Sequence, residues 1–247
     1  LLLFVFLFSF LASHTAAQCW EWQNPLPQGN DLYDVFFIDS QTGWAVGIFG
    51  TILKTNNGGL NWEVKNSGTT NTLQAVFFLD GQMGWAVGNE GTILKTMNGG
   101  QYWDKQISGI TNTFNAVHFL DSQTGWVVGD GGKASKTTDG GQTWSIQTLA
   151  LNSLLDVQFT DSQIGWVIGS SGGILKTTDA GQTWNTQPSG TSNWLNALHF
   201  IDNLTGWIVG DFDVVLKTIN GGQTWYPQTA TSNASFLLSV HFVDSQK

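Results

Sequence analysis

Apolar residues are arranged along this chain in short runs that are separated by glycine-rich turns. In one stretch the runs cover residues 73–80, 85–88 and 92–96, and Trp103 starts another after the turn MNGGQYW. Runs of this length, bounded by turn residues, are typical of β-strands, and no stretch shows sustained helical periodicity. We therefore expect four short antiparallel strands in this stretch.

The same pattern recurs five times. The pair Gly-Trp occurs at 43–44, 84–85, 125–126, 165–166 and 206–207, and the steps between copies are 41, 41, 40 and 41 residues. Four strands per repeat of this length are typical of one blade of a β-propeller. We expect an all-β propeller of four-stranded antiparallel blades, with five full blades plus partial blades of an incomplete six- or seven-bladed ring.

A second motif lies between the third and fourth strand of each repeat. In KTTDGGQTW (residues 136–144) it fits [ST]-x-[DN]-x-G-x-[TS]-W, the pattern of an Asp-box. The Asp or Asn side chain can bond its own backbone and brace a tight turn, while glycine allows a positive φ. We assign this structural role to Asn57, Asn98, Asp139, Asp179 and Asn220, together with the closing tryptophans Trp62, Trp103, Trp144, Trp184 and Trp225.

The repeated combination GWAVG…GTILKTxNGGxxW resembles the photosystem II stability/assembly factor-like family of BNR/Asp-box propellers. The resemblance covers residues 19–247. It implies a non-catalytic role, because family members that assist photosystem II act as scaffolds for membrane-protein intermediates. Exported bacterial proteins also carry these repeats, as adhesion or surface modules.

The charge of the chain narrows the functions further. The net charge is −9, and all nine basic residues are lysines. The chain therefore lacks the basic surface of a nucleic-acid binder. It also lacks the arginine cluster with which a sialidase holds its substrate carboxylate.

A glycosidase that uses two carboxylates is harder to exclude. Such a pair should break the repeat, as do Glu90, Asp130, Asp211 and Asp213 in the loops between second and third strands, and Asp34 and Asp156 on first strands. The two carboxyl groups would have to lie about 5 Å apart in a retaining enzyme, or about 6.5–9.5 Å apart in an inverting one. We predict that the loop acids are solvated and form a candidate ligand face, with no catalytic residue.

Other repeated polar residues are expected to serve structure. We expect Asp39 and its equivalents (Asp80, Asp121, Asp161, Asp202, Asp244) to brace the turn before Gly-Trp. His118, His199 and His241 share a position that Phe and Gln fill elsewhere, so we predict packing rather than a metal site. Lys54 and its equivalents (Lys95, Lys136, Lys176, Lys217) are expected to form a solvated ladder on the third strands. No metal or other cofactor is predicted.

The beginning of the chain has a different character. Residues 1–17 read as part of a signal peptide, with an apolar run followed by small residues. Cys19 is the only cysteine, which excludes an internal disulfide. We assign residues 18–247 to the propeller, interpret residues 19–25 as a strand that closes its last blade, and expect the propeller to be truncated at the C-terminus.

We thus expect an exported module, secreted, periplasmic or at the cell surface, that does not span a membrane once the leader is removed. It should be a non-enzymatic scaffold that binds a protein or glycan, through its loop face or central channel. The alternatives are a carboxylate-pair glycoside hydrolase of the Asp-box propeller type and a photosystem assembly factor, which would require a photosynthetic source.

Overall fold

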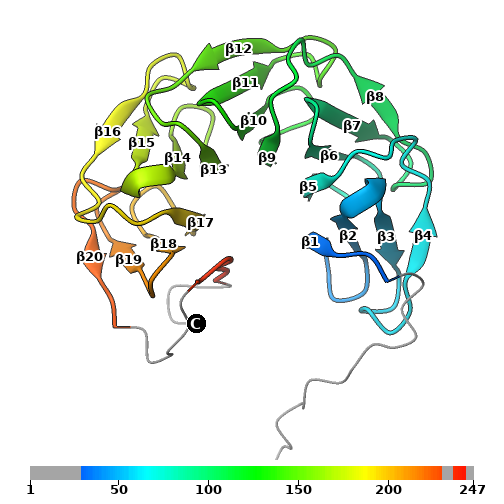
Figure 1. The fold of residues 1–247 in the computed structure, drawn as a ribbon, viewed down its shortest axis with the longest axis horizontal. Coiled ribbons are helices and arrows are strands. Elements are labelled where there is room, and N and C mark those ends of the chain that lie inside the picture. Colours follow the sequence, from blue (N-terminus) through cyan, green and yellow to red (C-terminus); the bar gives the residue numbers. More distant parts are fainter. Residues whose placement is uncertain (1–28, 230–235, 243–247) are drawn as a thin grey trace, which may run out of the picture.

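The computed structural model describes residues 29–229 and 236–242, which form five four-stranded sheets arranged along an open arc (Figure 1). The first sheet contains β1 (Leu32–Phe37), β2 (Gly43–Gly47), β3 (Ile52–Thr55) and β4 (Glu63–Lys65). The second contains β5 (Leu73–Phe78), β6 (Gly84–Gly88), β7 (Thr92–Thr96) and β8 (Asp104–Gln106), and the third β9 (Phe114–Phe119), β10 (Gly125–Gly129), β11 (Lys133–Thr137) and β12 (Ser145–Thr148). The fourth contains β13 (Leu154–Phe159), β14 (Gly165–Gly169), β15 (Ile174–Thr177) and β16 (Asn185–Gln187), and the fifth β17 (Leu195–Phe200), β18 (Gly206–Gly210), β19 (Val215–Thr218) and β20 (Tyr226–Pro227).

Each sheet is one blade, and its strands follow chain order from the inside of the arc to the outside. The second strand of each blade is buried along its whole length, as its sequence GWAVG or a close variant requires. The first glycine of this strand permits close packing, because a Cβ at Gly84 would lie 2.6 Å from the ring of Phe78. The prediction of an all-β protein with four-stranded antiparallel blades is confirmed.

Neighbouring blades are joined by a repeated aromatic contact. Trp44 of the first blade stacks on Phe78 of the second, with ring centroids 3.5 Å apart and planes 10° apart. The Asp-box residue Trp103 also contacts Phe78 in a T-shaped arrangement, with ring centroids 5.8 Å apart. Equivalent stacks join Trp85 to Phe119, Trp126 to Phe159, and Trp166 to Phe200. The core therefore lies between blades, and each of the second, third and fourth blades supplies half of two interfaces.

The Asp-box is a closed network of hydrogen bonds. Thr137 Oγ1 donates to Asp139 Oδ1 (2.8 Å) and accepts from the Gly141 amide (2.8 Å). Asp139 Oδ1 also accepts from the Thr143 amide, and the Thr143 hydroxyl donates to Oδ2 at 2.6 Å. These bonds, the hydroxyl of Thr143 first, lower the pKa of Asp139 to about 2. In the second blade Asn98 Oδ1 accepts from the Thr96 hydroxyl and the Tyr102 amide, both at 3.0 Å, so the turn keeps its shape with Asn.

The lysines before the Asp-boxes differ from the expected solvated ladder, and that prediction is wrong. Lys54 is only 9% exposed, and its ammonium donates to the carbonyl of Gly99, in the Asp-box of the next blade, at 2.9 Å. The same ammonium lies 5.1 Å from the centre of the Trp44 ring. Lys95, Lys136 and Lys176 make equivalent bonds to Gly140, Ala180 and Gly221. Adjacent blades are thus joined by a lysine ammonium of one blade that donates a hydrogen bond to an Asp-box carbonyl of the next.

Residues 236–242 continue the pattern beyond the fifth blade. The Leu237 amide donates to the Gly210 carbonyl (3.2 Å), and Phe242 stacks on Trp207 with centroids 3.9 Å apart. This segment therefore takes the place of a first strand beside the fifth blade. Ring closure and the number of blades stay predictions, and the leader, Cys19 and the closing strand 19–25 lie outside the described residues. In the part of the chain that the structure describes, no helix is long and apolar enough to cross a membrane.

Candidate functional site

The two edges of the blades form two faces of the arc. The turns between second and third strands lie at one edge, together with the connections from each fourth strand to the next blade, because the strands alternate in direction. We call this edge the loop face. It carries the short 3-10 turns η1 (Ile48–Gly50) and η2 (Ser170–Gly172), both visible in Figure 1. The Asp-boxes and the Asp39-type turns lie at the opposite edge.

The acids of the Asp39-type turns are engaged within their own turns. Asp39 Oδ1 accepts from the amides of Gln41 and Thr42, both at 2.7 Å. These two backbone hydrogen bonds lower the pKa of Asp39 below its usual value. Equivalent bonds occur at Asp80, Asp121, Asp161 and Asp202, whereas Asp244 lies outside the described residues.

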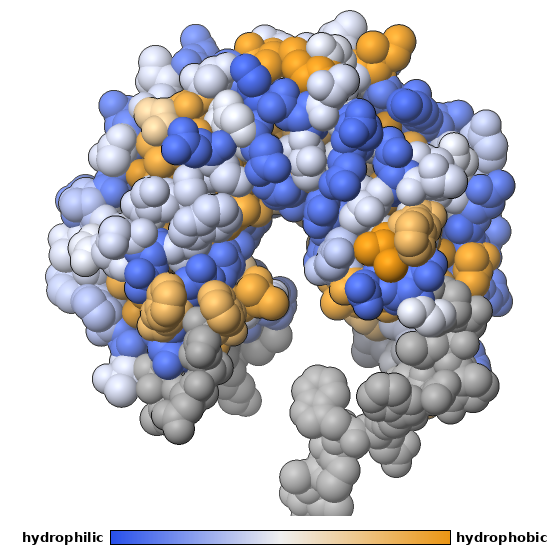
Figure 2. Space-filling model, in the orientation of Figure 1, coloured by the Kyte–Doolittle hydropathy of each residue, from blue (hydrophilic) through white to orange (hydrophobic). Residues whose placement is uncertain are grey.

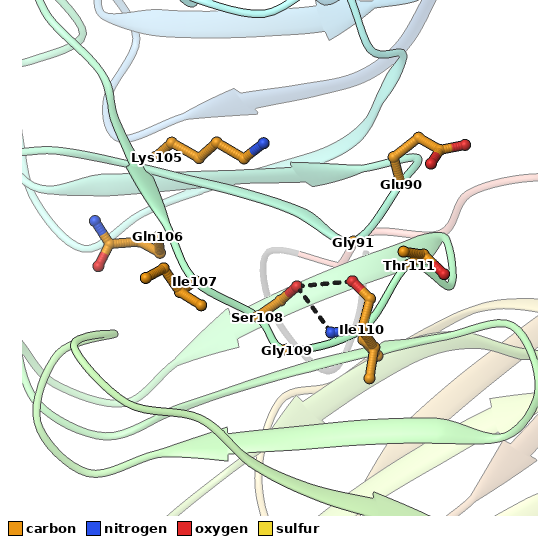
Figure 3. A pocket seen from close by; sticks show the side chains of 9 residues that line it. All are labelled: Glu90, Gly91, Lys105, Gln106, Ile107, Ser108, Gly109, Ile110 and Thr111. Atoms are coloured by element: carbon orange, nitrogen blue, oxygen red, sulfur yellow. Dashed lines mark hydrogen bonds between the residues drawn. The ribbon is translucent and has the colours of Figure 1, made fainter.

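Glu90, one of the four predicted ligand-face acids, borders a groove on the loop face of the second blade. The groove has a volume of about 390 Å³ and is lined by Glu90, Gly91 and residues 105–111. Figure 3 shows Glu90, in the turn between β6 and β7, and Lys105, on β8, at its edge, with Ser108 bonded to the backbone of Ile110. Ile107, which also lines the groove, is 85% exposed. The groove thus has mixed apolar and charged walls, suited to a contact rather than to enclosed chemistry.

Asp130 and Asp211 accept hydrogen bonds from side chains on or next to the innermost strands. Asp130 Oδ1 accepts from the Asn115 carboxamide (3.1 Å) and from the Ser153 hydroxyl (2.7 Å). Asp211 Oδ1 accepts from the Asn196 carboxamide at 2.8 Å. The four loop acids are therefore spread over three blades, and only Asp211 and Asp213 share a turn.

Asp34 and Asp156 line a single cavity of about 210 Å³ among the innermost strands. Each carboxylate bridges two blades: Asp34 accepts from the amides of Val35 and Val76, both at 2.8 Å, and Asp156 from those of Val157 (2.8 Å) and Leu198 (2.9 Å). Burial raises the pKa of Asp34 to about 6 and that of Asp156 to about 7. Two backbone donors per carboxylate indicate a structural role in joining blades.

The histidine position is also a packing position. The His118 ring lies 5.2 Å from that of Phe77, and burial lowers its pKa to about 4. His199 and His241 contact each other edge-on at 4.6 Å. Among the described residues, no group of three or more His, Cys, Asp or Glu side chains could hold a metal ion.

Exposed aromatic residues on the loop face were not anticipated from the sequence. Phe49 and Phe212 at turn tips are both 69% exposed, and Trp194 and Phe236, which precede first strands, are 47% and 58% exposed. A signal was present, because equivalent positions in other repeats hold Glu90, Gly131 or Ser171, and Asp31, Thr72, Thr113 or Ser153. Aromatic residues that break a repeat on the surface indicate a contact rather than a core.

The sequence of these Asp-box repeats matches the model of a known protein family. The family model described as Photosynthesis system II assembly factor YCF48 matches residues 12–108 and 146–234. The chain belongs to this family. No curated protein matches the sequence.

Solved structures are similar to this chain at low sequence identity. A structure of YCF48 bound to D1 peptide is 18% identical, with a TM-score of 0.45 over 79% of this chain and 95% of that one. The GH74 enzyme of Niastella koreensis is 19% identical, with a TM-score of 0.63 over 79% of this chain and 38% of the enzyme. An ancestral GH74 enzyme is 16% identical, with a TM-score of 0.67 over 86% of this chain and 33% of the enzyme. The likeness to these enzymes shows the propeller fold alone.

Proposed function

We propose that this chain is an exported, non-catalytic scaffold that binds a protein partner through its loop face. One observation carries the proposal. The polar side chains that recur in the described repeats bond within their own blade or to the next one, as Asp39, Lys54 and Asp139 do. Most of the exposed aromatic side chains that break the repeat lie instead on the loop face, namely Phe49, Trp194, Phe212 and Phe236, whereas Tyr102 lies on the Asp-box edge. Such side chains are available to a partner, and aromatic residues are enriched where proteins bind one another.

Membership of the YCF48 family supports a scaffold over an enzyme. The apolar leader of residues 1–17 supports export. The Asp-box edge serves the fold rather than a partner, because its polar groups already form the hydrogen bonds that close the turns.

A two-carboxylate hydrolase is the alternative, and one observation favours it. Asp34 and Asp156 line the same cavity, and burial raises the pKa of both. Their hydrogen bonds to backbone amides of successive blades nevertheless give both carboxylates a structural task. The alternative predicts hydrolysis of a polysaccharide that is lost in Asp156→Asn.

Site-specific photo-crosslinking tests the proposal. A crosslinking amino acid is placed on the loop face at Glu90 or Phe212, and on the Asp-box edge at Leu60 or Tyr102, which are 73% and 64% exposed. We expect the loop-face variants to capture the same protein from the exported and membrane fractions of the source organism, and the Asp-box variants to capture none. Equal capture from both edges, or hydrolysis of a polysaccharide panel without any capture, would contradict the proposal.

A further inference from the structure

The loop face departs from the repeat at three neighbouring positions, two in the fifth blade and one in the segment that follows it. Its turn between second and third strands reads Asp211-Phe212-Asp213, whereas the third residue of this turn is glycine in the other four blades (Gly50, Gly91, Gly132, Gly172). The residue before its first strand is Trp194, and the equivalent residue of the following segment is Phe236. We call Trp194, Asp211, Phe212, Asp213 and Phe236 the blade-5 patch.

The turn of the patch has an unfavourable backbone conformation. Phe212 has φ of 56° and Asp213 φ of 59°, so two successive residues with side chains occupy the left-handed region. Bulky residues are rare there, and such conformations cluster at functional sites because the surrounding structure must hold them. In the other four blades the third residue of this turn is glycine, which adopts a positive φ without steric strain. The fifth blade therefore retains a strained turn, which places an aromatic ring between two acids.

The members of the patch are adjacent. The Asp211 amide donates to the Trp194 carbonyl at 3.0 Å, and Asp211 pairs with Phe236 in an antiparallel bridge. The rings of Phe212 and Phe236 have centroids 6.1 Å apart. Figure 2 shows apolar side chains beside hydrophilic ones at the end of the arc that carries β18–β20. Two exposed aromatic rings thus lie near each other, and the backbone of the exposed Trp194 lies beside the same turn.

No lysine of the described residues forms an ion pair with the carboxylates of the patch. The only ion pair among the described residues joins Lys65 to Glu63, far along the chain from the patch. Asp213 Oδ1 is shielded from solvent and has no hydrogen-bond partner among the described residues. Phe212 and Asp213 also line a cavity of about 230 Å³ with Val214, Pro227 and Gln228. A positively charged or N–H-bearing group that enters this cavity could supply the missing donor.

We propose that the blade-5 patch binds a polypeptide segment in which apolar residues alternate with lysine or arginine. The apolar side chains lie on Phe212, Phe236 and Trp194, and the cationic groups reach Asp211 and Asp213. A neutral glycan would leave both carboxylates unbalanced, and the net charge of −9 disfavours an acidic partner. This inference rests on the proposed function and identifies the site and the chemistry of the partner.

A fluorescent peptide of alternating phenylalanine and lysine is the probe, and its binding is measured by anisotropy at low and high salt. Phe212→Gly and Asp213→Gly introduce the residues found at Gly131 and Gly132 of the third blade, so the fold should tolerate both. We expect each variant to weaken binding at least about tenfold, with no loss of thermal stability, and salt to weaken binding to the parent chain. Phe49→Gly is the matched control, because Phe49 has the same exposure and backbone conformation but Ile48 and Gly50 as neighbours. It should leave binding unchanged.

Three control ligands decide the chemistry. Peptides in which serine replaces phenylalanine, or glutamate replaces lysine, should not bind, and neither should a neutral gluco-oligosaccharide. Binding of the serine–lysine peptide as tightly as the probe would reduce the patch to nonspecific charge attraction, and binding of the oligosaccharide alone would make it a glycan site. Both outcomes overturn the proposal, as does equal weakening by Phe49→Gly. The crosslinker at Glu90 can be combined with Phe212→Gly or Asp213→Gly. If these chains still capture the same partner, this site is wrong while the proposed function stands.

Discussion

Phe37 in the first blade and Phe78 in the second occupy the same place in the repeat, yet 41% of Phe37 is exposed and only 2% of Phe78. Phe78 stacks on Trp44 and makes a T-shaped contact with Trp103. Phe37 has only the edge-on contact of Trp62, because among the described residues no tryptophan of a preceding blade stacks on it. Identical sequence features therefore bury very different areas. A blade of this protein acquires its core from its neighbours, as expected for a repeat whose units cannot fold alone.

The largest effect expected from this comparison concerns the two phenylalanines. Phe78→Ala should lower the free energy of unfolding by about 3–5 kcal/mol, because it opens a cavity between two tryptophans. Phe37→Ala should cost about 1–2 kcal/mol, since much of its ring already meets solvent. Urea denaturation followed by tryptophan fluorescence measures both. Equal costs would show that the first blade is covered in solution as well as the second.

A second effect concerns the lysines that link the blades. The Lys176 ammonium donates to the Gly221 carbonyl at 2.7 Å, while Lys217 lies over Trp207 at 4.8 Å and has no such acceptor among the described residues. Lys176→Met should cost about 1.5–3 kcal/mol, the usual range for a charge-assisted hydrogen bond. Lys217→Met should cost less than about 1 kcal/mol, from the ring contact alone. The difference between their urea midpoints is the measurement, and a reversed order would contradict the link.

A third, smaller difference should appear in the dependence of stability on pH. The pKa of Asp156 (about 7) and that of Asp34 (about 6) lie above the ordinary value of 3.8. Their contribution to the free energy of unfolding is therefore fully present below pH 3.8 and is lost as pH rises through the folded pKa. His118, with a pKa of about 4, has the opposite trend: its contribution is present above 6.5 and is lost as pH falls through 4. Asp156→Asn should therefore flatten the decline in stability between pH 5 and 8, more than Asp34→Asn does.

Thermal melts at several pH values across that range measure the slope for each variant. His118→Phe, which introduces the residue found at Phe77, is the control that removes the opposing histidine. A decline that both Asp variants leave unchanged would show that neither carboxylate is protonated more readily in the folded protein.

The smallest effect is expected in the Asp-boxes. The low pKa of Asp139 means that its contribution is present above 3.8 and is lost as pH falls through about 2. Asp139→Asn keeps the bonds that Asn98 makes in the second blade, and should change stability at neutral pH only slightly. Acid unfolding of the variant should start from a lower stability and depend less on pH in this range. An unchanged acid profile would exclude a contribution from this carboxylate.

The spacing of Gly-Trp predicts the blades well, because each marker occupies one fixed place in a unit that repeats. Contacts between blades were predicted less well. The Lys54 bond to Gly99 joins residues 45 positions apart, and whether the lysine reaches the next turn depends on how blades are inclined to one another. The sequence carries no such information. The positive φ values of Phe212 and Asp213 were not predicted either, although the sequence shows that Asp213 replaces the glycine of the other blades.

Each lysine link runs in one direction, from a blade to its successor, and every joint between the described blades uses the same chemical groups. The lysine link alone therefore sets no order among the blades, whereas the Asp34 and Asp156 bridges occur only between the first and second and between the fourth and fifth blades. Unequal recombination between repeats in a gene of this kind would add or remove a whole unit and keep the lysine link at the new joint. The number of blades can thus change in a single genetic step, while a specialised turn such as that of the fifth blade is inherited intact.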